Sequence, residues 1–124
     1  ILITAGFAPV STYVSERLGF KNVVSNEFEF DNNKFTGKYV PIIATKNAKL
    51  NCLKEICTKK TINQKKVVAI GDGANDLGML NYSGLGIGYN AHQIVKDNIK
   101  NQIFYTDLKS VLFFLGINEI EFTK

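Results

Sequence analysis

Apolar residues follow two patterns along the chain: short continuous runs, and positions spaced three or four residues apart. Continuous runs are typical of strands buried on both faces of a parallel sheet, and the wider spacing is typical of helices. Residues 1–3 form such a run, and residues 7–18 have helical spacing, with Pro9 in the first turn and Gly19 at the end. The same criteria predict strands over residues 20–25, 67–70, 85–89 and 102–105, and helices over 45–58, 76–82, 91–99 and 107–115.

A β-hairpin is expected at about 26–39. Apolar and charged residues alternate over residues 27–30, the polar triplet of residues 31–33 follows, and residues 35–39 return to strand character. Glu27 and Glu29 are interpreted as the exposed face of this hairpin.

Strands that alternate with helices predict an α/β fold with a parallel sheet and right-handed crossovers. The helix over 45–58 buries a stripe of Leu50, Leu53, Ile56 and Cys57, and Asp107 is expected to cap the last helix. There is no internal repeat or low-complexity linker, so we expect one domain, a partial one, over residues 1–124.

Composition excludes several classes of function. The net charge is +4, but the 14 lysines and one arginine are spread among 13 asparagines without clustering, which argues against nucleic-acid binding. No segment approaches the roughly 18 apolar residues of a membrane span. Cys52 and Cys57 lack zinc-site spacing and, as unpaired thiols, suit a cytoplasmic protein. The chain starts at Ile1 inside a predicted strand, so we expect the natural protein to start earlier.

The chemistry centres on residues 67–77, where an apolar run ends in Gly-Asp-Gly-Ala-Asn-Asp. Ligands of an open parallel sheet bind beyond the carboxyl ends of its strands, so Asp72 and Asp76 could hold a hard cation such as Mg²⁺, with Asp76 acting directly or through a metal-held water. An alternative interpretation makes Asp72 a turn former and Asp76 a helix N-cap.

Other groups suited to phosphate binding lie outside this segment: residues 4–6 follow the predicted strand over 1–3, and Lys49 lies near the start of the predicted helix over 45–58. Thr4 offers a hydroxyl, Ala5 and Gly6 offer backbone N–H groups, and Lys49 offers an ammonium. Together with an Asn75 amide, such donors can surround the equatorial oxygens of a phosphoryl group. Each also has a structural alternative: Thr4 near a helix N-cap, and Lys49 on a solvated surface. His92 is interpreted as a structural or surface residue, and the glycines at 84, 86 and 88 as sites of tight strand packing rather than a dinucleotide site.

The order of these patches resembles the haloacid dehalogenase superfamily, and within it the phosphoserine phosphatase family. The matching patches are Asn26 to Phe30, Phe35-Thr36-Gly37, Lys49, Gly71 to Leu77, Gly84 to Gly88 and Asp107-Leu108. The resemblance implies a Rossmann-like three-layer core and a Mg²⁺-dependent phosphomonoesterase acting on O-phospho-L-serine. It places the second motif at Thr4, the third at Lys49, which stands 23 residues before Asp72 as in the family, and the fourth at Asp72, Asn75 and Asp76.

Two departures from the family pattern stand out. Relatives commonly read Ser-Gly-Gly where this chain reads Thr-Ala-Gly, and a positive φ at Ala5 would cost about 1 kcal/mol. The Asp-x-Asp-x-Thr motif that carries the family's nucleophile does not occur in these 124 residues, and neither does the cap that recognises serine. The core is therefore expected to be incomplete, with unpaired sheet edges at residues 1–3 and 67–70 and an isolated chain that is inactive.

Two hypotheses remain open. In the first, the chain is the carboxyl-terminal part of a Mg²⁺-dependent phosphatase that acts on a small phosphomonoester, O-phospho-L-serine by resemblance. The rest of that enzyme is either missing from this sequence or encoded as a separate amino-terminal segment. In the second, it is a non-catalytic remnant or interaction module of the same fold.

Overall fold

The computed structural model describes residues 1–121 and divides into two compact units, Ile1–Glu55 and Ile56–Lys124. The division falls inside helix α2 (Ala48–Lys59). Each unit contains its own three-stranded sheet.

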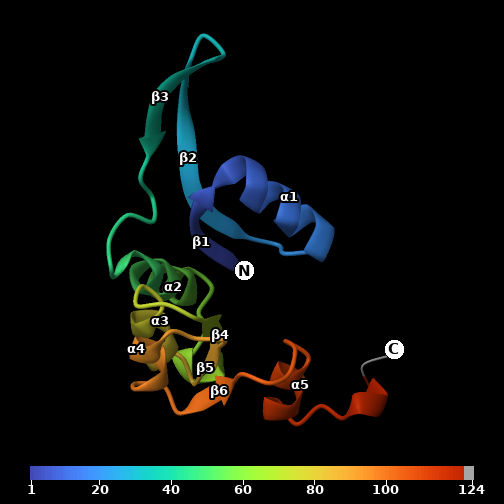
Figure 1. The fold of residues 1–124 in the computed structure, drawn as a ribbon. Coiled ribbons are helices and arrows are strands. Elements are labelled where there is room, and N and C mark those ends of the chain that lie inside the picture. Colours follow the sequence, from blue (N-terminus) through green and yellow to red (C-terminus); the bar gives the residue numbers. More distant parts are fainter. Residues whose placement is uncertain (122–124) are drawn as a thin grey trace. The chain divides into compact units, whose positions relative to one another are not determined.

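The first unit contains β1 (Leu2–Phe7), α1 (Ala8–Leu18), β2 (Val23–Asp31) and β3 (Lys34–Val40). β1 runs parallel to β2, and β3 pairs with β2 in the antiparallel sense. Figure 1 shows α1 beside β1 and β2, and the paired β2 and β3 extending away from that helix as a long hairpin. The predicted strand over 20–25 and the first arm of the predicted hairpin are thus one continuous strand.

The hairpin turn has the backbone that its sequence favours. Asn32 and Asn33 both have positive φ, 46° and 61°, as the central residues of a type I′ turn require. Aromatic rings of the three strands pack together. The rings of Phe7 in β1 and Phe28 in β2 stack with centroids 4.3 Å apart, and Phe35 in β3 contacts Phe28 edge-on. Glu27 and Glu29 are exposed, as expected.

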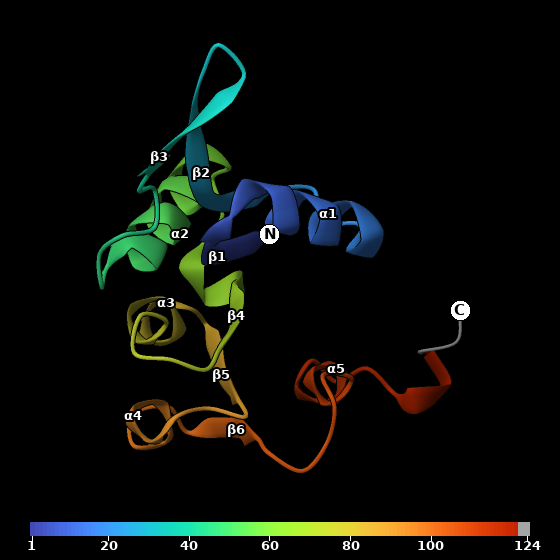
Figure 2. The ribbon, with the colours of Figure 1, turned by 45° about the horizontal axis from the view of Figure 1, so that its top comes forward.

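The second unit is a parallel sheet with helices on both sides. Its strands β4 (Val68–Gly71), β5 (Leu85–Tyr89) and β6 (Asn101–Ile103) lie in that order. Helices α3 (Leu77–Tyr82) and α4 (Gln93–Lys96) lie on one side, and α5 (Ser110–Phe114) lies on the other (Figure 2). A core of Ile87, Ile103 and Val111 joins the sheet to α5.

The glycines of this sheet confirm the prediction of tight packing. A Cβ atom at Gly84 would collide with the Lys65 carbonyl, and one at Gly86 would collide with the Leu80 carbonyl. These positions bring the backbones of the strand and its neighbours together.

Several element bounds differ from those predicted. Helix α4 has four residues instead of the predicted nine, because it begins only at Gln93 and because Asp97 and Asn98 form a turn rather than further helix. The N-cap of α5 is Lys109 rather than Asp107. The Asp107 carboxylate instead accepts a hydrogen bond from the Lys109 N–H at 2.9 Å, one turn ahead of the helix. In α2, Leu53 and Cys57 of the predicted stripe are buried, whereas Leu50 and Ile56 are half-buried. Short 3₁₀ turns cover Gln64–Lys66 and Glu119–Glu121.

The parallel pairings confirm the predicted α/β class. β1 is an edge strand of the first unit's sheet and β4 is an edge strand of the second unit's sheet, as expected. Among the described residues, no helix is long and apolar enough to cross a membrane.

Candidate functional site

The acidic loop after β4 is built around the Asp76 side chain. Its Oδ2 accepts hydrogen bonds from the N–H groups of Asp72, at 3.0 Å, and Gly73, at 3.1 Å. The side chain is only 2% exposed, whereas Asp72 is exposed. The buried carboxylate therefore holds the loop backbone, and the Asp72 carboxylate faces solvent, where a cation can reach it.

Two further backbone contacts, at Gly71 and His92, hold the acidic loop in place. Asp76 lies over Gly71 so closely that a Cβ atom at Gly71 would overlap its side chain, which explains the glycine. The N–H of His92 donates to the Asp72 carbonyl at 2.9 Å, so the turn before α4 also fixes the residue with the exposed carboxylate. The backbone of His92 thus has a structural role, and its side chain is exposed, in agreement with the interpretation as a structural or surface residue.

The alternative interpretation of Asp76 as a helix N-cap predicts its position correctly but not its hydrogen bonds. Asp76 is the N-cap residue of α3, but its side chain makes no capping hydrogen bond and reaches back to the loop instead. Asn75 is half-buried beside it. The loop is thus held by its own carboxylate.

The predicted phosphate-binding residues Thr4, Ala5 and Gly6, here called the phosphate turn, lie in the other unit. They are part of β1 (Leu2–Phe7), which continues past its predicted end at residue 3. The Gly6 N–H donates to the Thr4 hydroxyl oxygen at 3.0 Å, and Ala5 and Gly6 are exposed. The N-cap of α1 is Phe7, so Thr4 lies near the N-cap, as the alternative interpretation has it, but does not itself cap the helix. Ala5 is not among the residues with positive φ, so its methyl group causes no backbone strain. The change from the family's Ser-Gly-Gly is therefore tolerated by the backbone.

Lys49 lies in the first turn of α2 and is half-buried. It belongs to the same unit as Thr4, while Asp72, Asn75 and Asp76 belong to the other. That these groups serve one site stays a prediction.

The donor set fits a hard cation in part. No group of three His, Cys, Asp or Glu side chains that could hold a metal ion occurs within residues 1–121. Mg²⁺ keeps several waters and takes one or two carboxylates plus substrate phosphate, so the exposed Asp72 carboxylate fits this role. Oδ2 of Asp76 is already held by two backbone N–H groups.

Thiol chemistry is disfavoured at both cysteines. Burial, together with the neighbouring Glu55 carboxylate, raises the pKa of the Cys52 thiol above its ordinary value, which keeps it protonated at neutral pH. Cys57 is buried, and neither cysteine forms a disulfide.

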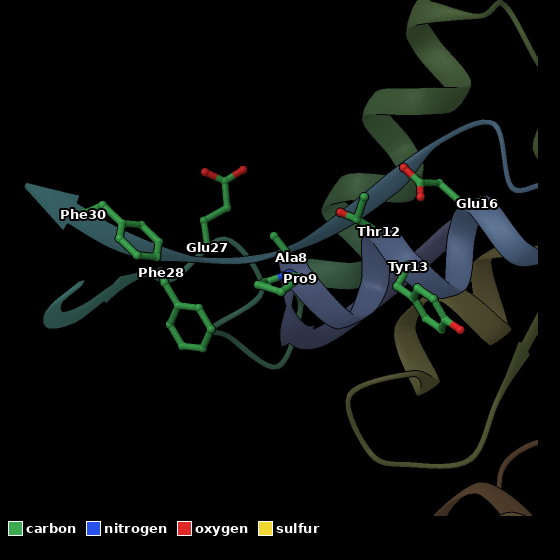
Figure 3. A pocket seen from close by; sticks show the side chains of 8 residues that line it. All are labelled: Ala8, Pro9, Thr12, Tyr13, Glu16, Glu27, Phe28 and Phe30. Atoms are coloured by element: carbon green, nitrogen blue, oxygen red, sulfur yellow. The ribbon is translucent and has the colours of Figure 1, made fainter. Parts of the chain in front are cut away.

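A hollow of about 450 Å³ lies in the first unit between α1 and β2 (Figure 3). In that view the Glu27 side chain leaves β2 on the opposite side from Phe28. The residues lining the hollow are Ala8, Pro9, Thr12, Tyr13, Glu16, Glu27, Phe28 and Phe30. None of them is a predicted site residue, so this hollow is not the candidate site.

A profile of haloacid dehalogenase-like hydrolases matches residues 14–115, which is most of the chain. The chain belongs to this family. The resemblance seen in the acidic loop and its companion patches is therefore confirmed at the level of the haloacid dehalogenase-like family.

Curated relatives of this haloacid dehalogenase-like chain are phosphoserine phosphatases. The Streptomyces coelicolor protein is 32% identical over 120 residues, covering 97% of this chain and 29% of its own length. The Lactococcus lactis protein is 32% identical over 114 residues, covering 92% and 53%. The relatives named phosphoserine phosphatase are matched over 28% to 54% of their lengths, so the chain spans about half of them or less.

Solved structures agree with this family. A substrate-bound phosphoserine phosphatase complex has a TM-score of 0.82 and 31% identity, and the match covers 94% of this chain and 54% of that one. A phospho-aspartyl intermediate analogue of phosphoserine phosphatase also has a TM-score of 0.82, with 55% of that chain covered.

Sequence reasoning missed two supporting contacts. One is the His92 backbone bond to Asp72, and the other is the buried side chain of Asn26, which bonds to the Ala5 carbonyl at 2.9 Å. Asn26 stands inside a matched family patch, and that was the signal that could have drawn attention to it.

Proposed function

We propose that this chain supplies the metal-binding and phosphate-binding part of a Mg²⁺-dependent phosphomonoesterase that converts O-phospho-L-serine to L-serine and phosphate. The observation that carries the proposal is the acidic loop, in which buried Asp76 holds the backbone and leaves the Asp72 carboxylate exposed. The names of the curated relatives support the choice of substrate.

Each predicted site residue has a role in this proposal. Asp72 binds Mg²⁺, and Asp76 supports it by ordering the loop and by binding a metal-held water. Lys49 is the catalytic cation that neutralises charge on the transferred phosphoryl group. The remaining groups bind phosphate oxygens: the Thr4 hydroxyl, the Ala5 and Gly6 backbone N–H groups, and the Asn75 amide.

When bound, Mg²⁺ supplies positive charge that offsets the negative charge of the phosphate oxygens. The residues of this chain bind and orient the phosphoryl group, because catalysis of phosphoryl transfer depends mainly on positioning and electrostatic stabilisation. The Thr4 hydroxyl oxygen accepts a hydrogen bond from the Gly6 N–H, and the hydroxyl keeps its own O–H to donate to a phosphate oxygen, which suits it to that work.

The nucleophile has to come from elsewhere. No Asp-x-Asp-x-Thr motif is present in the 124 residues, so we propose that an amino-terminal segment bearing it completes the site. The edge positions of β1 and β4 support such a segment, because an edge strand offers unpaired backbone N–H and C=O groups. We place the reaction in the cytoplasm, where two unpaired thiols stay reduced.

The test is reconstitution. The chain is mixed with a segment that bears the missing motif, drawn from the part of a curated relative that the chain does not cover, and phosphate release from O-phospho-L-serine is measured with Mg²⁺. We expect release from the mixture and none from either component alone. No release from the mixture, under conditions where both parts associate, would contradict the proposal and favour a non-catalytic interaction module.

A further inference from the structure

The pairing of β1 with β2 is broken at the predicted phosphate turn. Ile3 pairs with Val24 and Phe7 pairs with Asn26, so Thr4, Ala5 and Gly6 stand opposite Ser25 alone. Such a bulge takes backbone groups out of the strand ladder, and these groups need other hydrogen-bond partners.

Asn26 provides the partner for one of these groups. Its side-chain Nδ2 donates to the Ala5 carbonyl at 2.9 Å, and its Oδ1 accepts from the Ile43 N–H at 2.7 Å. Asn26 is 5% exposed and Ile43 is 6% exposed. A carbonyl on one side and an N–H on the other leave only one orientation of the amide, so the side chain is fixed at both ends.

This contact controls the direction of the Gly6 N–H, which holds the Thr4 hydroxyl. The Ala5 carbonyl and the Gly6 N–H belong to one planar peptide group and point in opposite directions. Because Asn26 holds the carbonyl on its buried side, the Gly6 N–H points the other way, toward the Thr4 hydroxyl oxygen 3.0 Å away. The buried amide thus sets the orientation of the exposed turn.

We propose that Asn26 is a positioning residue for phosphate binding: through the Ala5 carbonyl it orients the Ala5–Gly6 peptide so that the Gly6 N–H holds the Thr4 hydroxyl oxygen and the hydroxyl faces the phosphoryl group. This inference rests on the proposed function, and it adds a residue that none of the expected phosphate or metal contacts includes. Asn26 acts on the substrate only through the turn.

The test compares Asn26→Asp with Ser25→Ala in the chain completed by its amino-terminal segment. Asn26→Asp keeps an acceptor for the Ile43 N–H but replaces the donor that faces the Ala5 carbonyl. Ser25→Ala is the matched control, since Ser25 is also buried in β2 and its hydroxyl bonds at 2.8 Å to Ser11 of α1 rather than to the turn.

The readout is inhibition by each product. For Asn26→Asp we expect the inhibition constant of inorganic phosphate to rise about tenfold, the size expected when a hydrogen bond to a charged group is lost. The constant of L-serine should stay unchanged. Ser25→Ala should leave both constants unchanged. An equal loss of phosphate affinity in the two variants would show a general packing effect and overturn the inference.

A second measurement separates this inference from the proposed function. If the unsubstituted, completed protein releases no phosphate, the proposed function fails, and hydrogen exchange at the Gly6 amide of the full chain then decides the matter. Positioning by Asn26 predicts exchange at Gly6 that is about tenfold faster in Asn26→Asp than in Ser25→Ala. The same exchange rate in both variants would overturn the role of Asn26, whatever the activity.

Discussion

At the scale of single residues, the acidic loop could be predicted from the sequence and the support of the phosphate turn could not. Asp72 and Asp76 stand four residues apart after an apolar strand, so their chemistry is visible in one short segment. Asn26 reaches Ala5 and Ile43, which lie 21 and 17 residues away, and its contacts exist only after β1 and β2 have paired. A short sequence motif is therefore enough to predict the acidic loop. The support of the phosphate turn depends on tertiary contacts, which the sequence does not show.

A substitution at Asp76 tests whether its buried side chain orders the acidic loop. Replacing it with Ala removes the acceptor for two backbone N–H groups in a buried place, so we expect a loss of about 3 kcal/mol in the free energy of unfolding. Asp97→Ala, at an exposed carboxylate, should change stability by no more than about 0.5 kcal/mol. Denaturant unfolding of the completed protein gives both values, and equal losses would argue against the loop-ordering role.

A substitution at Lys49 tests its proposed catalytic role. We expect Lys49→Ala to reduce kcat for phosphoserine about 100-fold or more, since it removes a positive charge from the proposed phosphoryl site. Lys46→Ala, a nearby change at an exposed lysine, should retain activity. Steady-state kinetics on both variants measures kcat. A normal kcat for Lys49→Ala would contradict the catalytic role and favour the alternative that Lys49 is a solvated surface residue.

At the scale of elements, strands and helices were predictable wherever local patterns decide them. The helix α1 ends at Gly19 with φ of 72°, as the glycine indicated, and the hairpin turn falls on its asparagines. What the sequence did not show was the continuity of β2 across two predicted strands. That continuity depends on β2 pairing with β1 on one side and β3 on the other, which is a tertiary property.

The hairpin turn carries a prediction of its own. Asn33 has φ of 61°, a conformation in which a Cβ atom is strained and glycine is not. We expect Asn33→Gly to match or exceed the unsubstituted protein in stability, and Asn33→Ala to lose about 1 kcal/mol. Thermal unfolding of the pair measures the difference. If both substitutions gave the same midpoint, the assignment of the turn would be wrong.

At the scale of the whole molecule, family membership was recoverable from the sequence because the matched patches occur in the family's order. The chain nevertheless spans about half or less of its curated relatives, and each of its two sheets ends at an edge strand, β1 or β4. A strand edge needs a partner that the local sequence of that strand does not encode. The proposal that an amino-terminal segment completes the site therefore rests on properties of the whole molecule.

The central claim is that the exposed carboxylate of the acidic loop binds the metal of a phosphatase site. The most direct measurement is Mg²⁺-dependent phosphate release from O-phospho-L-serine by the completed protein carrying Asp72→Asn, with Asp97→Asn as the matched control. The account predicts that Asp72→Asn loses at least about 100-fold in activity, as expected when a group that stabilises the transition state is removed, and that Asp97→Asn keeps it. Equal activity of the two variants at every Mg²⁺ concentration would contradict the account.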